Sequence, residues 1–146
     1  MVLKVKKFTE DEYNNYAEWF NDESISRFLG EIDTEWLDYV LNAVEISQLS
    51  FYDDNRFIGV VGIYLPNPEH NYYTILDFAI NPIAQKQGYG TAIIHYLMNS
   101  DDYKETNIWK AIVSLDNKNA RSFFKTNGWK YEGFEDDDYI KILFKK

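Results

Sequence analysis

The chain has 146 residues, a length that fits one domain with a single hydrophobic core, and we expect that domain to span 1–146. It contains no cysteine, which excludes disulfides, thiolate metal sites and a cysteine nucleophile, and which fits a cytoplasmic location. The formal net charge of −9 opposes a nucleic-acid partner, because phosphate backbones bind basic surfaces, and no apolar run is long enough to predict a membrane partner.

The first third of the chain predicts one short strand followed by helices. The opening residues alternate in part between apolar and polar side chains, which indicates a strand. Thr9 and Glu12 have the spacing of a capping box, so a helix is expected to begin there. Two further short helices are expected, one at Asp22 and one capped by Asp33 or Thr34.

The remaining two thirds predict six strands and two helices. The strands are expected at 49–52, 56–65, 72–80, 107–115, 129–134 and 139–144, and the helices at 92–98 and 117–126. The strand-helix-strand unit that ends at residue 115 indicates a parallel pair with a right-handed crossover. We therefore predict an α/β (mixed α+β) fold, with a mixed, mostly antiparallel central sheet of about seven strands and helices on both faces.

One glycine-containing loop, between the strand that ends at 80 and the following helix, carries most of the functional information. Its residues are Gln85-Lys86-Gln87-Gly88-Tyr89-Gly90-Thr91. Glycines let a backbone approach an anion, and the start of a helix adds unpaired N–H donors. The arrangement is typical of a phosphate-binding loop, although two glycines before a helix are also compatible with a simple tight turn.

The spacing Gln85-x-x-Gly88-x-Gly90 resembles the acetyl-CoA pyrophosphate loop of the GNAT N-acetyltransferase superfamily. The segment from Asn117 to Trp129 is similar to the family's next motif, which reads Asn, two residues, Ala or Ser, an aliphatic-aromatic pair and Gly-Phe. The resemblance implies the GNAT fold, acetyl-CoA as co-substrate and no metal. His70 and His95, the two histidines, lack partners at metal-ligand spacing.

The resemblance also implies how acetyl-CoA is held. Backbone N–H groups of the glycine loop would bind the pyrophosphate, and the strand before it would pair its backbone with the pantetheine arm. Asn117 would hydrogen-bond the pantetheine, with a helix cap as the alternative reading. The residues expected to contact acetyl-CoA are Ala79, Ile80, Gln85, Lys86, Gln87, Gly88, Tyr89, Gly90, Thr91, Asn117 and Phe124.

Phe124 departs from the family pattern. Many family members carry tyrosine at this position, where the hydroxyl protonates the departing CoA thiolate, and phenylalanine cannot donate a proton. The chain is therefore expected to use another donor, to use water, or to perform no transfer. Phe123, the neighbouring residue, is expected in the core.

The resemblance is less specific about the general base, the group that takes a proton from the attacking amine. Thr74 stands where histone-type members place a catalytic glutamate, and Asp77 is the nearest carboxylate on the same strand. In a regular strand these two side chains face opposite ways, so only a bulge between them would bring Asp77 to the catalytic face. A purely structural, hydrogen-bonded Asp77 is the alternative. Glu31 and Asp33, between the early helices, are the alternative candidates for the base, and as part of the substrate wall they are expected to bind the amine.

The predicted function is an enzyme, an acetyl-CoA-dependent N-acetyltransferase that moves the acetyl group to a primary amine by direct attack in a ternary complex. The acceptor is a small molecule or a peptide, and a homodimer is compatible with the sequence. The alternative from another class is a catalytically inactive GNAT-fold sensor or interaction module that binds acyl-CoA, which the absence of tyrosine at Phe124 favours. Thioester hydrolysis or transfer of a longer acyl chain also stays open.

Overall fold

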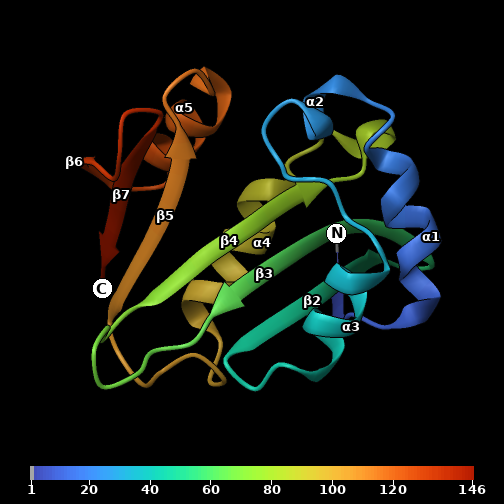
Figure 1. Ribbon diagram of the computed structural model, residues 1–146, viewed down its shortest axis with the longest axis horizontal. Coiled ribbons are helices and arrows are strands. Elements are labelled where there is room, and N and C mark those ends of the chain that lie inside the picture. Colours follow the sequence, from blue (N-terminus) through green and yellow to red (C-terminus); the bar gives the residue numbers. More distant parts are fainter. Residues whose placement is uncertain (1) are drawn as a thin grey trace.

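The computed structural model describes residues 2–146, whose strands form one sheet in the order β1-β2-β3-β4-β5-β7-β6 (Figure 1). The strands are β1 (Leu3–Lys7), β2 (Ile46–Asp53), β3 (Arg56–Tyr64), β4 (Tyr73–Ile80), β5 (Ile108–Ser114), β6 (Lys130–Phe134) and β7 (Tyr139–Lys145). The helices are α1 (Glu10–Trp19), α2 (Glu23–Ser26), α3 (Thr34–Asn42), the 3₁₀ turn η1 (Pro82–Ala84), α4 (Tyr89–Asn99) and α5 (Lys118–Thr126).

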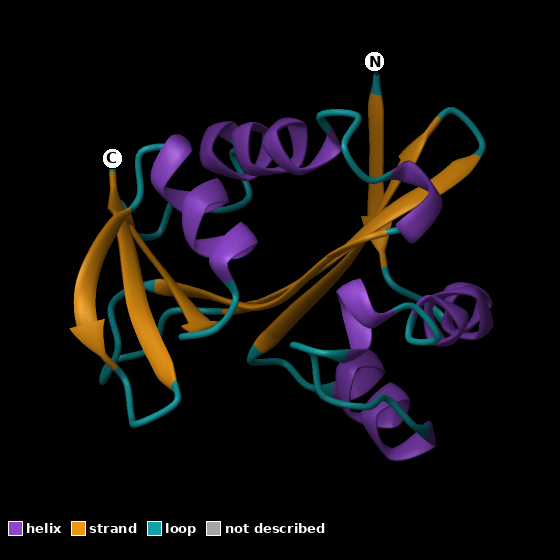
Figure 2. Cartoon of the chain, turned by 90° about the horizontal axis from the view of Figure 1, so that it is seen from above, coloured by secondary structure: helices purple, strands orange, loops and turns teal. Residues whose placement is uncertain are grey.

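Neighbouring strands pair antiparallel except for β4 and β5, which are parallel and joined through α4. Helices α4 and α5 cover one face of the sheet, and α1, α2 and α3 cover the other (Figure 2). The prediction of a mixed, mostly antiparallel seven-stranded sheet with helices on both faces is confirmed.

Strand β2 begins three residues earlier than the sequence predicted. The segment that was not recognised contains Gln48, which is buried although it is polar, and Ser50 further along the strand is buried too. Hydrophobic alternation identifies a strand only when its inward positions are apolar, so this pattern concealed the start of β2.

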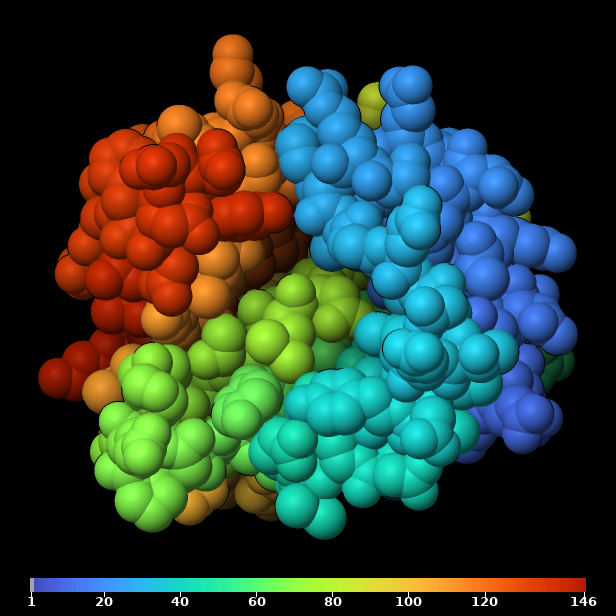
Figure 3. Space-filling view, in the orientation of Figure 1, coloured from blue at the N-terminus to red at the C-terminus, as the bar shows by residue number. Residues whose placement is uncertain are grey.

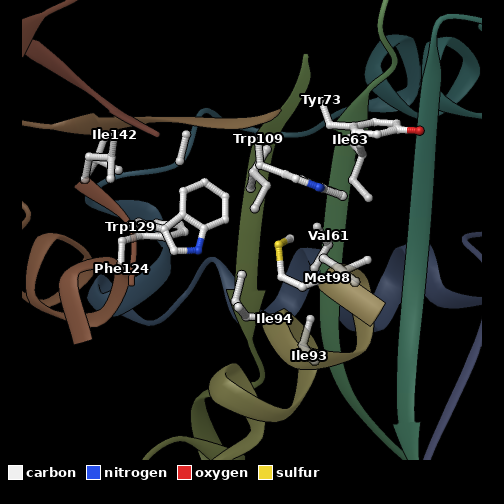
Figure 4. Packing of buried hydrophobic residues seen from close by; sticks show 14 of the residues in the cluster. Val61, Ile63, Tyr73, Ile93, Ile94, Met98, Trp109, Phe124, Trp129 and Ile142 are labelled. Carbon is white, nitrogen blue, oxygen red and sulfur yellow. The ribbon is translucent and has the colours of Figure 1, made fainter. Parts of the chain in front are cut away.

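The larger of two hydrophobic clusters lies between the sheet and α4 and α5 (Figure 4). Trp109 of β5 is fully buried at its centre and stacks on Tyr73 of β4, with ring centroids 4.6 Å apart. Burying an aromatic side chain of this size removes roughly 150–250 Å² of surface from water. This packing therefore holds β4 and β5 together at the end of the sheet where they pair.

The parallel contact between β4 and β5 is short. Only Tyr73, Thr74 and Ile75 of β4 pair with β5, whereas β5 continues along its whole length beside β7. Beyond Ile75 the two strands diverge (Figure 1). The sheet is therefore open on the β5 side of β4 over residues 76–80.

On the face of the sheet opposite α4 and α5, Glu12 connects α1 to strands β1 and β2. The predicted capping box is present, and the Oε1 atom of Glu12 accepts hydrogen bonds from the backbone N–H of Thr9 at 2.9 Å and from Ser50 Oγ at 3.3 Å. Its Oε2 atom accepts from Tyr52 at 3.1 Å and lies 2.8 Å from Lys6 Nζ. Burial opposes ionisation, but the donors from Lys6, Thr9 and Tyr52 prevail and hold the pKa of Glu12 below its ordinary value.

We predict that Glu12→Gln lowers the free energy of unfolding by about 1–3 kcal/mol at neutral pH, because several donors lose a charged acceptor. A depressed pKa stabilises the fold above the pKa of the unfolded chain, and this stability is lost as the pH falls through the folded pKa. The difference from wild type should therefore shrink between about pH 5 and pH 3 in urea unfolding. Glu10→Gln, at an exposed position in the same turn, is the control. A difference that is independent of pH would contradict the prediction.

Candidate functional site

The divergence of β4 and β5 leaves two cavities that meet. The loop cavity, of about 600 Å³, lies against the glycine loop, and the strand cavity, of about 470 Å³, lies between β4, β5 and the segment linking α2 to α3. A hollow between the N-terminal and C-terminal parts of the molecule, with β4 at its floor, is visible in Figure 3. The residues that line both cavities are Phe28, Phe78, Asn117, Ala120 and Phe124.

The glycine loop leaves the first-turn amides of α4 free toward the loop cavity. Gly88 is the N-cap residue, with a φ of 86°, and it has no side chain to cap the amides that follow. Lys86 also has a positive φ, of 63°, which is uncommon for a residue with a side chain. Helix N-termini and alternating backbone conformations of this kind bind anions. The loop residues therefore fit a phosphate group.

The two motif glycines serve different purposes. A Cβ atom at Gly88 would meet nothing within 4 Å, so glycine is required there by the backbone conformation. At Gly90 a Cβ atom would lie 3.1 Å from Cε1 of Phe123, so glycine allows α4 to approach α5. Phe123, expected in the core, packs against its edge, is only partly buried and lines the loop cavity, whereas Phe124 is the buried member of the pair.

Several polar side chains of the loop already have partners in the protein. Gln85 Nε2 donates to Ser24 Oγ at 2.9 Å and to the Ile80 carbonyl at 3.3 Å, and Gln87 Nε2 donates to the Ile83 carbonyl at 3.4 Å. Gln87 is also absent from the lining of the loop cavity. Contact of Gln85 or Gln87 with a phosphate would therefore rest on the backbone. Lys86 and Thr91 are exposed and line the loop cavity.

Tyr89 points away from the predicted phosphate site. Its ring is buried, and its hydroxyl donates to Asp53 and accepts from Arg56 in the β2–β3 hairpin. The side chain of Tyr89 thus anchors the start of α4, and only its backbone N–H can contribute to anion binding.

The backbone edge of β4 that faces away from β3 belongs to Phe78 and Ile80, and the Ile80 carbonyl on it accepts from Gln85. The N–H of Asn81 donates to the Ile58 carbonyl of β3 at 2.9 Å. Because orientation alternates along a strand, the peptide groups of Ala79 also face β3, opposite Val60, while those of Phe78 and Ile80 face the open side. The backbone of Ala79, predicted to pair with pantetheine, is therefore engaged with β3, while the N–H of Phe78 faces the open side.

Asn117 and Phe124 lie where the two cavities meet. Asn117 caps α5, accepting from the N–H of Ala120 at 3.1 Å, and within residues 2–146 its Nδ2 group donates to no partner. Phe124 is 5% exposed and packs on Trp129 with ring centroids 4.9 Å apart (Figure 4). The helix-cap role and an open amide donor therefore coexist at Asn117.

Strand β4 contains the bulge that a catalytic Asp77 requires. Asp77 pairs with Gly62 and Ile75 pairs with Ile63, so Leu76 is the extra residue. Asp77 lines the strand cavity, and its Oδ2 atom accepts a hydrogen bond from Gln48 Nε2 at 2.9 Å. Burial raises the pKa of Asp77, and the hydrogen bond from Gln48 opposes this rise.

Gln48, Gly62 and Asp77 form a row across three strands, since Gln48 pairs with Gly62 and Gly62 with Asp77. A Cβ atom at Gly62 would lie 2.6 Å from Gln48 Oε1 and 2.7 Å from Asp77 Oδ1. Glycine therefore makes the space in which the two side chains meet. Sequence reasoning missed both Gln48 and Gly62. Gly62 stands in the apolar strand β3, but Gln48 lies in a segment that the sequence did not identify as a strand, so no local signal joined the two residues.

The two acidic residues expected to bind the amine have different roles. Glu31 lines the strand cavity. Asp33 is the N-cap of α3, where Oδ1 accepts from the N–H of Trp36 at 2.8 Å, and it is absent from the cavity lining. The structure therefore places Asp33 at the start of α3 and outside the strand cavity, and its predicted contact with the amine stays a prediction. Tyr16 and Tyr139, which the sequence did not single out, contribute the phenols of this cavity.

Neither a metal cluster nor a membrane-spanning helix occurs among residues 2–146. These residues contain no group of three or more His, Asp or Glu side chains placed to hold a metal ion. None of their helices has the length and apolarity needed to cross a membrane.

Comparison with solved structures supports the fold. An acetyltransferase from Thermus thermophilus superposes with a TM-score of 0.85 at 16% identity, covering 100% of this chain and 98% of that one. An aminoglycoside acetyltransferase, AAC(6')-Ib, in complex with coenzyme A gives 0.82 at 17% identity, with coverage of 99% and 95%. Spermidine N-acetyltransferase from Vibrio cholerae, in complex with CoA and spermine, gives 0.80 at 16% identity, with coverage of 98% and 95%.

No curated protein matches the chain in sequence. A model of the acetyltransferase (GNAT) family matches residues 11–129, which include the glycine loop, the bulge and the α5 motif. The chain therefore belongs to the acetyltransferase (GNAT) family, the acetyl-CoA-dependent N-acetyltransferases.

Proposed function

We propose that the chain works as one acetyltransferase domain that transfers the acetyl group of acetyl-CoA to a primary amine. The observation that carries this proposal is the junction of the two cavities at Asn117 and Phe124. One cavity offers helix amides to a phosphate, and the other offers the carboxylate of Asp77. A substrate that extends from the loop to the junction would meet an amine that enters from the other side.

Acetyl-CoA supplies an activated thioester when it is bound. The amides from Gln85 to Thr91 would hold its pyrophosphate, and the open edge of β4 at Phe78 and Ile80 would pair with the pantetheine arm. Asn117 Nδ2 would donate to the same arm. An N–H on that edge is also suited to stabilise the negative charge that develops on the thioester oxygen.

The amine must lose a proton before or during attack. Asp77, within the strand cavity, would hold the incoming ammonium and accept this proton. The amine nitrogen then forms a bond to the thioester carbonyl carbon while the carbon–sulfur bond breaks, and the sulfur departs as thiolate. Because Phe124 has no hydroxyl, water or a phenol of the strand cavity must return a proton to the sulfur.

Two neighbouring structures contain ligands of the proposed kinds. The aminoglycoside enzyme was solved with coenzyme A and kanamycin, and the spermidine enzyme with CoA and spermine. These ligands belong to those proteins, and for the present chain they support CoA as co-substrate and a small amine as acceptor.

The first prediction from the proposed function concerns Gly88. Gly88→Ala should weaken binding of acetyl-CoA by at least about tenfold, because a strained φ realigns the amides of the loop. Gly128, with a φ of 88° and no part in either cavity, is the matched control. Both variants should lose about 1–2 kcal/mol of stability, and only Gly88→Ala should lose affinity in calorimetry. Equal affinity in wild type and Gly88→Ala would contradict the assigned loop.

The second prediction tests catalysis. Wild type with acetyl-CoA and a panel of amines should release free thiol. Asp77→Asn should lower kcat/KM by about 10²–10⁴-fold near neutral pH while leaving affinity for acetyl-CoA unchanged. The wild-type rate should rise as the pH rises through the elevated pKa of Asp77, and the variant should lack this rise. Asp33→Asn, which keeps a helix-capping side chain, is the control.

Two outcomes would change the assigned base or the assigned function. A variant Asp77→Asn whose pH profile overlays wild type would place the base elsewhere, with Glu31 next. Binding of acetyl-CoA without thiol release for any amine would favour the non-catalytic sensor, which the buried Phe124 in place of a tyrosine also favours.

A further inference from the structure

The charged groups of the strand cavity all have one sign. Asp77 and Glu31 carry carboxylates, and within the described chain no Lys, Arg or His lines the cavity. Such a lining attracts a cation and disfavours an acceptor that carries its own carboxylate or phosphate.

The rest of the lining is mainly apolar. Leu76, the bulge residue, is 44% exposed, and Ile112 of β5 is 36% exposed, so two aliphatic side chains face open space here. Trp36 lines the opposite wall and is held edge-on by Phe8, with ring centroids 5.5 Å apart. The remaining apolar members are Phe28, Leu29, Ile32, Ile75, Phe78, Ala111, Val113, Ala120 and Phe124.

We propose that the acceptor is an apolar primary amine with a single ammonium group on an aromatic or branched aliphatic body. This inference rests on the proposed acetyl transfer and specifies its substrate class. The ammonium would lie at Asp77, and the apolar body would contact Leu76, Ile112 and Trp36. Glu31, at the exposed rim, would attract the cation during approach.

Polyhydroxylated and polycationic amines fit this lining less well. Apart from the carboxylates and two phenols, the polar side chains are Trp36, Ser114 and Asn117, and Asn117 uses its oxygen to cap α5 while its Nδ2 group is assigned to the pantetheine arm. A sugar amine would leave several hydroxyls without partners, each costing a factor of roughly 5–150 in specificity. A polyamine would need a carboxylate for each further ammonium group.

The test compares kcat/KM for phenethylamine and isoamylamine with that for glucosamine, kanamycin, spermidine and an unblocked tripeptide. The apolar amines should exceed each of the others by at least about tenfold. Leu76→Asn should raise KM for phenethylamine without changing the melting shift given by acetyl-CoA, and Tyr131→Asn, exposed on β6, is the control. Preference for any of the other four acceptors would overturn the inference and leave acetyl transfer standing. Thiol release with none of them would instead refute the proposed function.

A different observation, the cross-strand row, carries a second inference. Gln48 is 2% exposed, it reaches across Gly62, and the hydrogen bond from its Nε2 is the contact that fixes the Asp77 carboxylate. We infer that Gln48 is a positioning residue, which orients Asp77 toward the acceptor and favours its ionised form. The other titratable groups that face this cavity are Tyr16, Glu31 and Tyr139.

The test is the pH dependence of Asp77. Gln48→Leu removes the donor at similar size, so the acid limb of kcat/KM should move to higher pH by about one unit. A ¹³C NMR titration of the Asp77 carboxyl, which needs no turnover, should show the same shift. Ser50→Ala, another buried polar position on β2, should cause no shift.

Gly62→Ala provides an independent check, because its methyl group would separate Gln48 from Asp77. Gly62→Ala should move the Asp77 titration to higher pH, as Gln48→Leu does, if Gln48 acts by orienting the carboxylate. A folded Gln48→Leu protein with an unchanged Asp77 titration would overturn this inference, whether or not the protein is active.

Discussion

The short parallel contact between β4 and β5 is the constraint on which the rest of the site depends. Pairing ends at Ile75, and the next residue, Leu76, is the extra residue of the β3–β4 bulge. A bulge bends its strand and increases the local twist, so the bulge and the divergence of the two strands are parts of one deformation. Had β4 continued regularly along β5, the backbone of Phe78 and Ile80 would be occupied and neither cavity would extend to the junction.

The same deformation sets the direction of Asp77. In an unbroken strand, Asp77 and Thr74 would lie on opposite faces. The bulge brings Asp77 opposite Gly62, where Gln48 can reach it from two strands away. Burial raises the pKa of Asp77 and the hydrogen bond from Gln48 opposes this rise, a combination that suits the base role proposed for it. The geometry of the strand and the chemistry of the carboxylate are therefore linked.

Features determined by local sequence could be predicted. The capping box at Thr9, the turn at Gly88 and the succession of strands and helices along the chain depend on nearby residues, and the structure contains them. Features determined by the pairing of strands could not be predicted from the sequence. Which peptide groups of β4 face outward depends on its register with β3, so Ala79 and Phe78 could not be told apart from the sequence alone. Capping adds a further ambiguity, because Asp33 and Asn117 both satisfy backbone donors at helix starts, and only Asn117 keeps a second polar atom toward the cavities.

The anchoring of the glycine loop at both ends has a thermodynamic consequence. Gln85 attaches the loop to Ser24 near α2, and Tyr89 attaches it to Asp53 and Arg56 of the hairpin. A loop held in this way loses little conformational entropy when it binds an anion. Less of the free energy of the contacts is then spent on ordering the loop, and the affinity is higher. If the loop binds the pyrophosphate as proposed, sequence change in the β2–β3 hairpin would alter the affinity for acetyl-CoA without contacting it.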